Sequence, residues 1–269
     1  MRTAAVLGWP VTQSLSPHLH GYWLREHRID GAYIALPVQR ENFSRVVEGL
    51  ILAGSSGASV TLPHKEAAFA IAHSVDSDAR AARAVNQLVF RDAKIHGLNT
   101  DVAGLTECLH AAKVDIAGKP VVLIGAGGAA RAAVLALRKM GASEIRALNR
   151  TPQRAQSLGT GKWGGLDEWS QAAMDVALVL NTSSAGMKGE APVELDLRLL
   201  PASAAICDIV YNPLQTALLA AAQARGLKTV DGLGMLMHQA VPAFEAFFGV
   251  RPAVTPALRR ALETALSHG

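Results

Sequence analysis

The sequence predicts an α/β protein with two domains, and three observations lead to this fold class. The chain has 269 residues, half of them apolar, which is enough for two separate cores. Short apolar runs alternate with helix-like segments along most of its length. One continuous apolar run, Val121–Ile124, leads directly into a glycine-rich turn, as in parallel sheets that bind dinucleotides. We therefore predict an N-terminal α/β domain, a Rossmann-type domain, and C-terminal helices that return to the first domain.

The first hundred residues supply the elements of the N-terminal domain. Ser16 and Pro17 are expected to begin a helix, because serine is a common N-cap and proline fits the first helical turn. Pro63 ends the third apolar run, since proline cannot donate a hydrogen bond to a sheet. The predicted strands are Ala4–Leu7, Ala32–Leu36, Gly57–Leu62, Gln87–Phe90 and Ile95–Leu98, the last two joined as a hairpin, and further helices are predicted at Asn42–Leu52 and His64–Ala72.

The rest of the chain predicts a second α/β domain followed by helices alone. A helix over Val102–Lys113 leads to the turn residues Gly118-Lys119-Pro120. Strands are predicted at Val121–Ile124, Glu144–Leu148, Val176–Leu180, Ala204–Ile209 and Lys228–Val230, with a helix at Ala129–Met140 that Gly141 ends. From Met235 the pattern is helical, at Leu236–Phe248 and Pro256–Leu266. The expected domains are residues 1–101, 102–234 and 235–269.

Composition limits the classes of function. Lys plus Arg number 26 against 22 Asp plus Glu, a mild excess without a long basic run. This favours a basic pocket for an anionic ligand over a nucleic-acid surface, although a basic pI without functional meaning is an equal alternative. Cys108 and Cys207 lie far apart and the histidines show no ligand spacing, so neither a disulfide framework nor a metal site is expected. With no signal-peptide pattern and no long apolar window, we predict a soluble cytoplasmic protein, monomer or homodimer, without membrane or nucleic-acid partners.

The turn after the run Val121–Ile124 carries the pattern GxGxxA, which is typical of a dinucleotide site. The first glycine permits a tight turn, the second lets the backbone approach a pyrophosphate, and the third, small position lets the helix pack on the strand. The N-terminus of the following helix supplies free N–H groups to the phosphates. The candidate cofactor-binding residues of this turn are Gly125, Ala126, Gly127, Gly128 and Ala129.

The end of the next strand indicates which dinucleotide binds. An NAD site usually has an Asp or Glu there for the ribose hydroxyls, whereas this strand ends in Asn149-Arg150-Thr151, with Arg154 one turn later. Two guanidinium groups and a hydroxyl suit the 2′-phosphate of NADP, which arginine can bind through two hydrogen bonds. The alternative is that both arginines are solvated residues at a helix start. We therefore expect NADP(H) as the cofactor.

Polar motifs throughout the chain resemble the shikimate dehydrogenase family. The resemblance runs in the family's order and spacing over nearly the whole chain, and each motif alone is far less specific. The matching segments are Ser14-Leu15-Ser16-Pro17, the stretch from Ser59 to Glu66, Ala84-Val85-Asn86, Asn99-Thr100-Asp101, the glycine turn, Asn149-Arg150-Thr151, the stretches from Asn181 to Met187 and from Asp208 to Pro213, and the stretch from Asp231 to Leu236 with Gln239.

The resemblance implies a role for each matching position. Lys65 and Asp101 are expected to form the catalytic pair, in a cleft between the domains. The implied substrate-binding residues are Ser14 and Ser16 for a carboxylate, Thr61, Asn86 and Gln239 for ring hydroxyls, and Tyr211 near substrate or nicotinamide; Ile209 and Gly232 are implied beside the nicotinamide. Taken alone, Lys65 would be a surface lysine, Asp101 a helix N-cap, and Thr61 an ordinary strand residue.

The implied reaction is the reversible, NADPH-dependent reduction of 3-dehydroshikimate to shikimate, a step of chorismate and aromatic amino acid biosynthesis. Adding hydride to a ketone builds negative charge on its oxygen, so a proton donor must lie beside that oxygen. The sequence offers no zinc site for this task, and Lys65 oriented by Asp101 can do it. Which of the two donates the proton is left open.

Three residues depart from the family pattern. Ser59 stands where the family usually has Asn, and its shorter reach suggests that a water substitutes for the amide. Gln87 replaces the usual Thr and Val102 the usual Gly, and neither is expected to touch the chemistry directly. The departure at Ser59 motivates an alternative, a dehydrogenase of quinate or a related cyclic hydroxy acid. A non-catalytic NADPH-binding regulator is a further alternative, which the presence of Lys65 and Asp101 disfavours.

Overall fold

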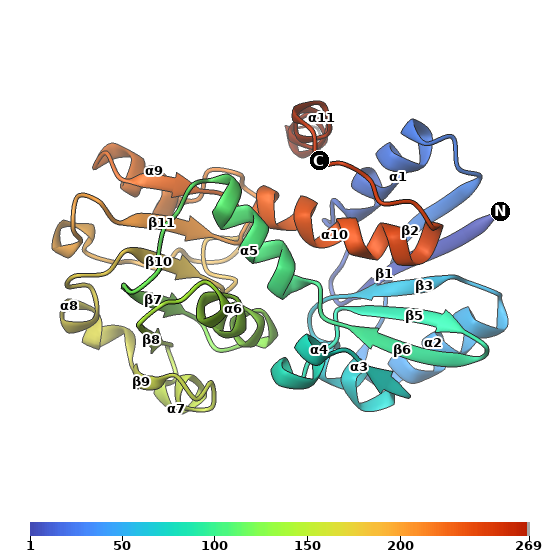
Figure 1. The fold of residues 1–269 in the computed structure, drawn as a ribbon, viewed down its shortest axis with the longest axis horizontal. Coiled ribbons are helices and arrows are strands. Elements are labelled where there is room, and N and C mark those ends of the chain that lie inside the picture. The colour runs from blue at the N-terminus through green and yellow to red at the C-terminus, as the bar shows by residue number, and fades with distance from the viewer. Residues whose placement is uncertain (268–269) are drawn as a thin grey trace. The chain divides into compact units, whose positions relative to one another are not determined.

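A computed structural model describes residues 1–267, and within them the chain forms two compact units. Unit 1 comprises Met1–Asp101 and the chain from Leu236 onward, and unit 2 comprises Val102–Met235. Each unit contains one six-stranded sheet among the described residues (Figure 1). Both boundaries fall inside helices, α5 (Asp101–Ala111) and α10 (Gly232–Phe248), so the chain changes units without an extended linker.

The sheet of unit 1 is mixed, with strand order β2-β1-β3-β5-β6-β4. β1 (Arg2–Gly8) lies parallel to both β2 (Gly31–Pro37) and β3 (Gly57–Val60). β5 (Gln87–Arg91) runs antiparallel to β3 and forms a hairpin with β6 (Lys94–Leu98), as the sequence predicts. The two-residue strand β4 (Ser74–Val75) was too short to show a pattern, and it completes the edge beside β6.

Helices cover both faces of this sheet. One face carries η1 (Arg40–Asn42), α2 (Phe43–Leu52), α3 (Lys65–Ile71) and α4 (Ser77–Ala82), and the other carries α1 (Ser16–Glu26), α10 and α11 (Pro256–Ser267). The first face is apolar, with Leu7 and Val60 of the sheet packed in one cluster with Phe43 and Val47. The second face is aromatic: Trp23 and Phe244 contact edge-on, and His20 stacks on Tyr33.

The start of α1 differs from the sequence prediction. Leu15, and not Ser16, is the N-cap residue, and no side chain caps the helix. Ser16 is therefore the first helical residue and is buried, with Pro17 in the first turn as predicted. The physical consequence is that the Ser16 hydroxyl is not used on its own helix N-terminus.

The sheet of unit 2 is wholly parallel, with strand order β12-β11-β10-β7-β8-β9. Its strands are β7 (Pro120–Ile124), β8 (Glu144–Leu148), β9 (Gly161–Gly164), β10 (Leu178–Asn181), β11 (Ala205–Asp208) and β12 (Lys228–Val230). Numbered within the unit, this is the order 3-2-1-4-5-6 of the Rossmann fold. The strand order reverses between β7 and β10, which is where such sheets bind their ligands.

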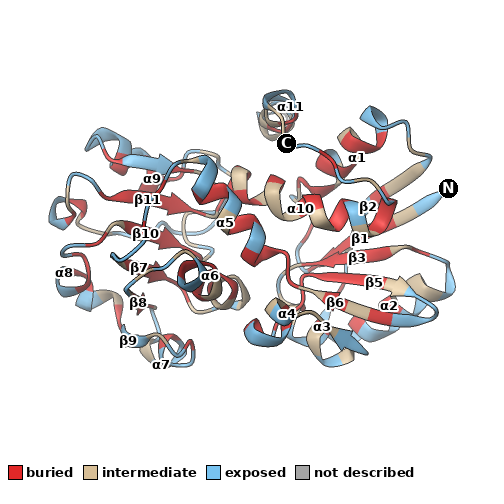
Figure 2. Cartoon of the chain, viewed as in Figure 1, coloured by how far each residue is buried: buried red, intermediate tan, exposed pale blue. Residues whose placement is uncertain are grey.

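The residues of β7 alternate between two apolar layers. Val121 and Leu123 belong to a cluster with α5 and α6 (Gly128–Lys139), whereas Val122 and Ile124 belong to a cluster on the opposite face. The buried strands at the centre of each sheet are visible in Figure 2. The remaining short elements of unit 2 are α7 (Pro152–Gln156), η2 (Leu166–Glu168), α8 (Trp169–Ala172), η3 (Leu197–Leu199) and α9 (Ala217–Ala224).

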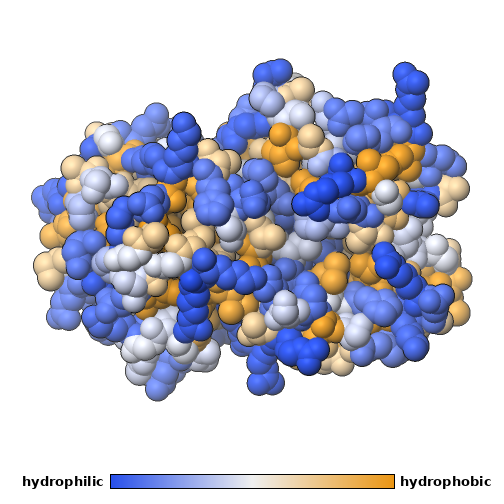
Figure 3. Space-filling view, viewed as in Figure 1, coloured by the Kyte–Doolittle hydropathy of each residue, from blue (hydrophilic) through white to orange (hydrophobic). Residues whose placement is uncertain are grey.

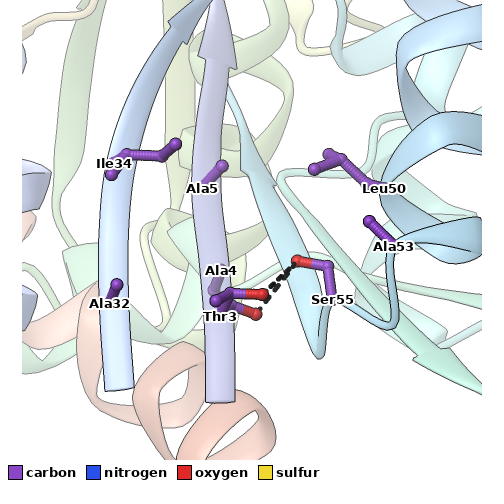
Figure 4. Close-up of a pocket in the computed structure, with 8 residues that line it drawn as sticks. All are labelled: Thr3, Ala4, Ala5, Ala32, Ile34, Leu50, Ala53 and Ser55. Carbon is purple, nitrogen blue, oxygen red and sulfur yellow. Dashed lines mark hydrogen bonds between the residues drawn. The ribbon is translucent and has the colours of Figure 1, made fainter. Parts of the chain in front are cut away.

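The part of the chain that the structure describes has no membrane-spanning helix, and an apolar hollow lies on unit 1. Within residues 1–267, no helix combines the length and the hydropathy that crossing a membrane requires. Polar and charged side chains are spread over the face drawn in Figure 3, with apolar patches between them. Figure 4 shows a hollow over β1, β2 and α2, lined mainly by alanines with Ile34, Leu50 and the hydrogen-bonded Thr3 and Ser55. No ionisable side chain lines it, so this hollow offers neither an acid or base nor a charged group for an anionic ligand.

Candidate active site

The candidate catalytic pair forms an ion pair within unit 1. Lys65 is the first residue of α3 and Asp101 the first residue of α5, so each side chain projects from a helix start. The Nζ of Lys65 lies 2.5 Å from Oδ2 of Asp101, with side-chain exposures of 14% and 7%. At this distance and burial the ammonium and the carboxylate hold each other in one geometry.

The residue before Lys65 anchors the helix that carries it. His64 is buried, its Nε2 lies 2.7 Å from the carbonyl oxygen of Val38, and its ring stacks on Phe43 at 4.7 Å between centroids. Burial lowers the pKa of His64, which keeps the ring neutral. The carbonyl oxygen of Lys65 accepts a hydrogen bond from the backbone N–H of Val85, which ties the helix start to the chain before β5.

Asparagine side chains hold Asp101. Asn86 donates through Nδ2 to Oδ1 of Asp101 at 2.8 Å, and its own Oδ1 accepts from the backbone N–H of Thr100. Asn99 accepts from the backbone N–H of Asp101 and donates to the carbonyl oxygen of Ala84. The Asn-Thr-Asp motif thus connects the start of α5 to the segment before β5, and all these residues are buried.

Two glutamines extend this cluster. Oε1 of Gln239, from α10, lies 3.5 Å from Nδ2 of Asn86 and 3.3 Å from Nε2 of Gln87. Gln87 was expected not to touch the chemistry directly, and its amide reaches the site through Gln239, a residue implied to bind substrate. Sequence reasoning missed it because Gln87 and Ser59 were treated as separate departures, although the two face each other across β5 and β3.

Of the other residues of unit 1 that are implied to bind substrate, Ser14 and Ser16 lie close together. The backbone N–H of Ser16 donates to Oγ of Ser14 at 3.3 Å, so the two serines share one turn. The buried hydroxyl of Tyr33 has side-chain hydrogen bonds to Ser59 and Ser16, and burial raises the pKa of this phenol far above its ordinary value. Thr61, half-buried, directly follows β3, and its N–H bonds the carbonyl oxygen of Leu7.

In unit 2, the glycine turn joins β7 to α6. Gly125 has φ +104°, and a Cβ there would lie 2.9 Å from Oγ1 of Thr182, so both conformation and space require glycine. Gly127 is the N-cap of α6, and a Cβ there would meet no protein atom within 4 Å. This open backbone, together with a first helical turn that holds no acidic residue, fits a pyrophosphate.

The end of β8 carries the cationic groups. Asn149 donates through Nδ2 to the carbonyl oxygen of Thr151, which shapes the turn before α7. Arg150 and Arg154 are exposed, Arg154 within α7. The strand end bears no carboxylate, so the residues present fit a phosphate at the 2′ position rather than free ribose hydroxyls.

The other implied cofactor residues lie where β11 and β12 end. A Cβ on Gly232 would collide with the carbonyl oxygen of Ile209, so the two backbones approach closely. Asp208 is fully buried between the hydroxyl of Thr216 and the amide of Asn181, and burial raises its carboxyl pKa. Tyr211 is half-buried and belongs to unit 2, whereas the other implied substrate residues belong to unit 1.

The fold and the site define the chain as a two-unit α/β protein with a dinucleotide-type parallel sheet and a lysine–aspartate site on the accompanying unit. Within residues 1–267, no cluster of histidine, cysteine or acidic side chains could hold a metal ion. Residues 6–88 match the family described as "Shikimate dehydrogenase substrate binding domain", and residues 108–180 match "Shikimate / quinate 5-dehydrogenase".

Known proteins resemble the chain over its full length. The shikimate dehydrogenase (NADP(+)) of Acidiphilium cryptum (strain JF-5) is 50% identical over 264 residues, 97% of this chain and 95% of that protein. The crystal structure of shikimate 5-dehydrogenase from Thermus thermophilus, in complex with NADP(H) and shikimate, superposes with a TM-score of 0.87 at 34% identity, covering 100% and 99% of the two chains. The chain belongs to the shikimate dehydrogenase family, as its motifs indicate.

Proposed function

We propose that the chain is an NADP-dependent shikimate dehydrogenase, an oxidoreductase that reversibly reduces 3-dehydroshikimate with NADPH and acts in chorismate and aromatic amino acid biosynthesis. The observation that carries the proposal is the buried ion pair of Lys65 with Asp101, bonded through Asn86 toward Gln239. A pair of this kind, beside donors for hydroxyl groups, suits reduction of a ketone on a hydroxylated ring. Residues 1–101 with the C-terminal helices serve as the substrate domain.

The pair of Lys65 and Asp101 supplies the proton of the reaction. When bound, NADPH supplies a hydride to the carbonyl carbon of the substrate. Negative charge then develops on the carbonyl oxygen, and the Lys65–Asp101 pair stabilises it and delivers a proton. Asp101 keeps the ammonium oriented, because its second carboxylate oxygen is held by Asn86. In the reverse direction the pair accepts the proton of the ring hydroxyl.

Polar side chains of unit 1 select the substrate. Ser14 and Ser16 bind its carboxylate, and Thr61, Asn86 and Gln239 bind its ring hydroxyls. These side chains are buried or half-buried, which supports their role in selecting the substrate. A buried group that normally bonds a substrate hydroxyl is left unpaired by an analogue that lacks the hydroxyl, so the site rejects that analogue. Tyr211 lies near the substrate or the nicotinamide.

Unit 2 binds the cofactor. The turn from Gly125 to Ala129 binds the pyrophosphate, and Ile209 with Gly232 lies beside the nicotinamide. Asn149, Arg150, Thr151 and Arg154 bind the adenosine ribose and its 2′-phosphate, which favours NADP over NAD.

A spectrophotometric assay tests this function. The purified protein is incubated with shikimate and NADP⁺, and formation of NADPH is followed by its absorbance, with NAD⁺ and quinate in parallel reactions. We expect turnover with shikimate and a clear preference for NADP⁺. Tight NADPH binding without turnover of any cyclic hydroxy acid would instead indicate a non-catalytic regulator.

The second candidate substrate is quinate. The sequence departs from the family pattern at Ser59, and the chain is also similar to the quinate dehydrogenase of Corynebacterium glutamicum, solved in complex with NAD (27% identity, TM-score 0.86, 99% of both chains covered). A higher kcat/KM for quinate than for shikimate at saturating cofactor would favour this candidate. The arginines after β8 argue against an NAD-dependent enzyme.

A further inference from the structure

Two departures from the family pattern, Ser59 and Gln87, are direct cross-strand partners. Ser59 on β3 pairs with Gln87 on β5 in the antiparallel register, and both residues are buried. The Oγ of Ser59 lies 2.7 Å from Oε1 of Gln87. The family pattern that the motifs resemble has an amide at position 59 and a hydroxyl at position 87, whereas this chain has the hydroxyl at 59 and the amide at 87. The same two functional groups are present, exchanged between adjacent strands.

Asp101 fixes the direction of the hydrogen bonds that reach this pair. An ionised carboxylate only accepts, so the Asn86 atom that lies 2.8 Å from Oδ1 of Asp101 is the amide nitrogen. The backbone N–H of Thr100 only donates and lies 2.8 Å from the other Asn86 atom, which fixes the same orientation from the opposite side. Asn86 therefore presents N–H groups, and never its carbonyl oxygen, toward Gln239.

The orientation then passes along the network. Asn86 Nδ2 donates to Asp101 and to Oγ1 of Thr100 at 3.0 Å, and the Thr100 hydroxyl in turn donates to Oε1 of Gln239 at 3.3 Å. Gln239 turns this oxygen toward Asn86, Thr100 and Gln87 because its Nε2 donates to the carbonyl oxygen of Leu236. Gln87 accordingly turns its amide nitrogen toward the same oxygen, at 3.3 Å. The carbonyl oxygen of Gln87 is left facing Ser59, which donates to it. Ser59 has one hydrogen, so it must accept from Tyr33, whose hydroxyl lies 2.6 Å away.

The end of the network is the amide nitrogen of Gln239. Its oxygen receives donors from Gln87 at 3.3 Å and Thr100 at 3.3 Å, and its Nε2 donates to the carbonyl oxygen of Leu236 at 3.1 Å. The amide nitrogen of Gln239 carries two hydrogens, and only one of them is donated to Leu236. The bonds that fix the amide also fix the direction of the second N–H. Gln239 is thereby set as a donor for a substrate oxygen.

We propose that Gln87 is a positioning residue for Gln239, and that Ser59 with Tyr33 fixes the orientation of the Gln87 amide. The inference rests on the proposed function, since Gln239 is assigned to the substrate there. It replaces the expectation that a water substitutes for the missing amide at Ser59, because Gln87 supplies an amide to the same network. Ser59 and Gln87 then determine substrate specificity together, and exchanging either residue alone weakens binding of the substrate.

Kinetic analysis of three variants tests the coupling. Gln87→Thr leaves the Ser59 hydroxyl without its acceptor and removes a donor to Gln239, and Ser59→Asn places a second amide opposite Gln87 in a packed sheet. We expect each single change to raise the KM for shikimate on the order of tenfold, with a smaller fall in kcat and no change in the KM for NADP⁺. The double variant Ser59→Asn/Gln87→Thr restores the family's pair, and its KM returns toward that of the unchanged protein.

A second measurement needs no turnover and separates this inference from the proposed function. In protein labelled with ¹⁵N-glutamine, the side-chain amide protons of Gln239, assigned through Gln239→Glu, are expected to exchange slowly with solvent. Their exchange should accelerate in Gln87→Thr and slow again in the double variant. Gln39→Thr, an exposed glutamine of unit 1, is the matched control and should leave both readouts unchanged. If the two single effects add in the double variant, or if Gln87→Thr leaves the Gln239 amide unchanged, the proposal is wrong whatever substrate the enzyme uses.

Discussion

The candidate sites of the two units consist of different kinds of chemical group. In unit 1 the site consists of buried side chains that bond one another, from Lys65 through Asp101 and Asn86 to Gln239. In unit 2 it consists mostly of backbone, at the open turn around Gly127, together with exposed arginines. A buried side-chain network can select one arrangement of hydroxyl groups, whereas backbone N–H groups and exposed cations bind phosphates, which many ligands share.

This difference predicts how substitutions act. In the candidate site of unit 1, the buried polar side chains bond one another, so a single change leaves partners unsatisfied and alters both chemistry and selectivity. In unit 2, exposed cations have room to move, so a change there weakens cofactor affinity and leaves the fold intact.

Lys65→Ala should lower kcat with shikimate by roughly 10²–10⁴-fold, because it removes the cationic member of the pair that supplies the proton. The fold should persist, since α3 is also anchored by His64, which bonds the carbonyl oxygen of Val38 and stacks on Phe43. The KM for NADP⁺ should stay unchanged, because the glycine turn lies in unit 2. Steady-state kinetics of NADPH formation, with circular dichroism to verify folding, measures this.

The matched control for that prediction is Lys94→Ala, an exposed lysine on β6 of the same unit, which should behave as the unchanged enzyme. Turnover of Lys65→Ala at the level of this control would remove Lys65 from the mechanism and leave the reaction without an assigned proton donor.

Arg150→Ala should raise the KM for NADP⁺ by about 10- to 100-fold, the loss expected for charge-assisted hydrogen bonds to a phosphate. The KM for NAD⁺ should hardly change, because NAD lacks the 2′-phosphate. Measuring kcat/KM with NADP⁺ and with NAD⁺ in the variant gives its preference between the two cofactors directly. Arg45→Ala, an exposed arginine on α2, is the control. An equal loss with both cofactors would mean that Arg150 contacts something other than the 2′-phosphate.

The sequence predicted those parts of the sites that depend on residues close together in the chain, and it missed parts that depend on contacts between distant residues. The glycine turn was predictable from local pattern, because strand, turn and helix follow one another within about twenty residues. The closeness of Lys65 and Asp101 came through family resemblance, since they are 36 positions apart and no periodicity links them. The role of Gln87 was missed because it depends on the register between β3 and β5, which no local pattern specifies.

Short elements were missed for a related reason. α7 has five residues and β9 has four, too few for a hydrophobic period to stand out. They form because neighbouring strands supply their partners, as β8 does for β9. The start of α1 differs for another reason: Ser16 is buried on the aromatic side of unit 1, and this burial outweighs the tendency of serine to cap its own helix.

The aromatic layer of unit 1 should make the protein sensitive to acid. His20 is buried with no partner for Nδ1 and stacks on Tyr33 at 3.9 Å, and burial lowers its pKa to about 3. The folded pKa lies below the unfolded value of 6.5, so this contribution to stability is complete above pH 6.5 and is lost as pH falls toward 3. The loss amounts to about 1.4 kcal/mol per pH unit, or roughly 2 kcal/mol at pH 5.

His20→Phe tests this by removing the titrating group while keeping an aromatic ring. The free energy of unfolding, from urea titrations between pH 7 and pH 5, should fall less steeply in the variant. His110→Phe, which changes an exposed histidine of α5, should keep the slope of the unchanged protein. Identical slopes in all three proteins would show that His20 is not neutral in the folded state.

Two glycines of the turn in unit 2 should differ in what their substitution affects. Gly125→Ala should lower the free energy of unfolding by about 1–3 kcal/mol, because the residue has φ +104° and its Cβ would crowd Thr182. Gly127→Ala should leave the unfolding free energy nearly unchanged, since a Cβ there meets open space, yet raise the KM for NADP⁺ by blocking the approach of the pyrophosphate. Urea unfolding and cofactor kinetics on both variants decide this, and a Gly127→Ala enzyme with normal NADP⁺ affinity would mean that the phosphates bind elsewhere on the turn.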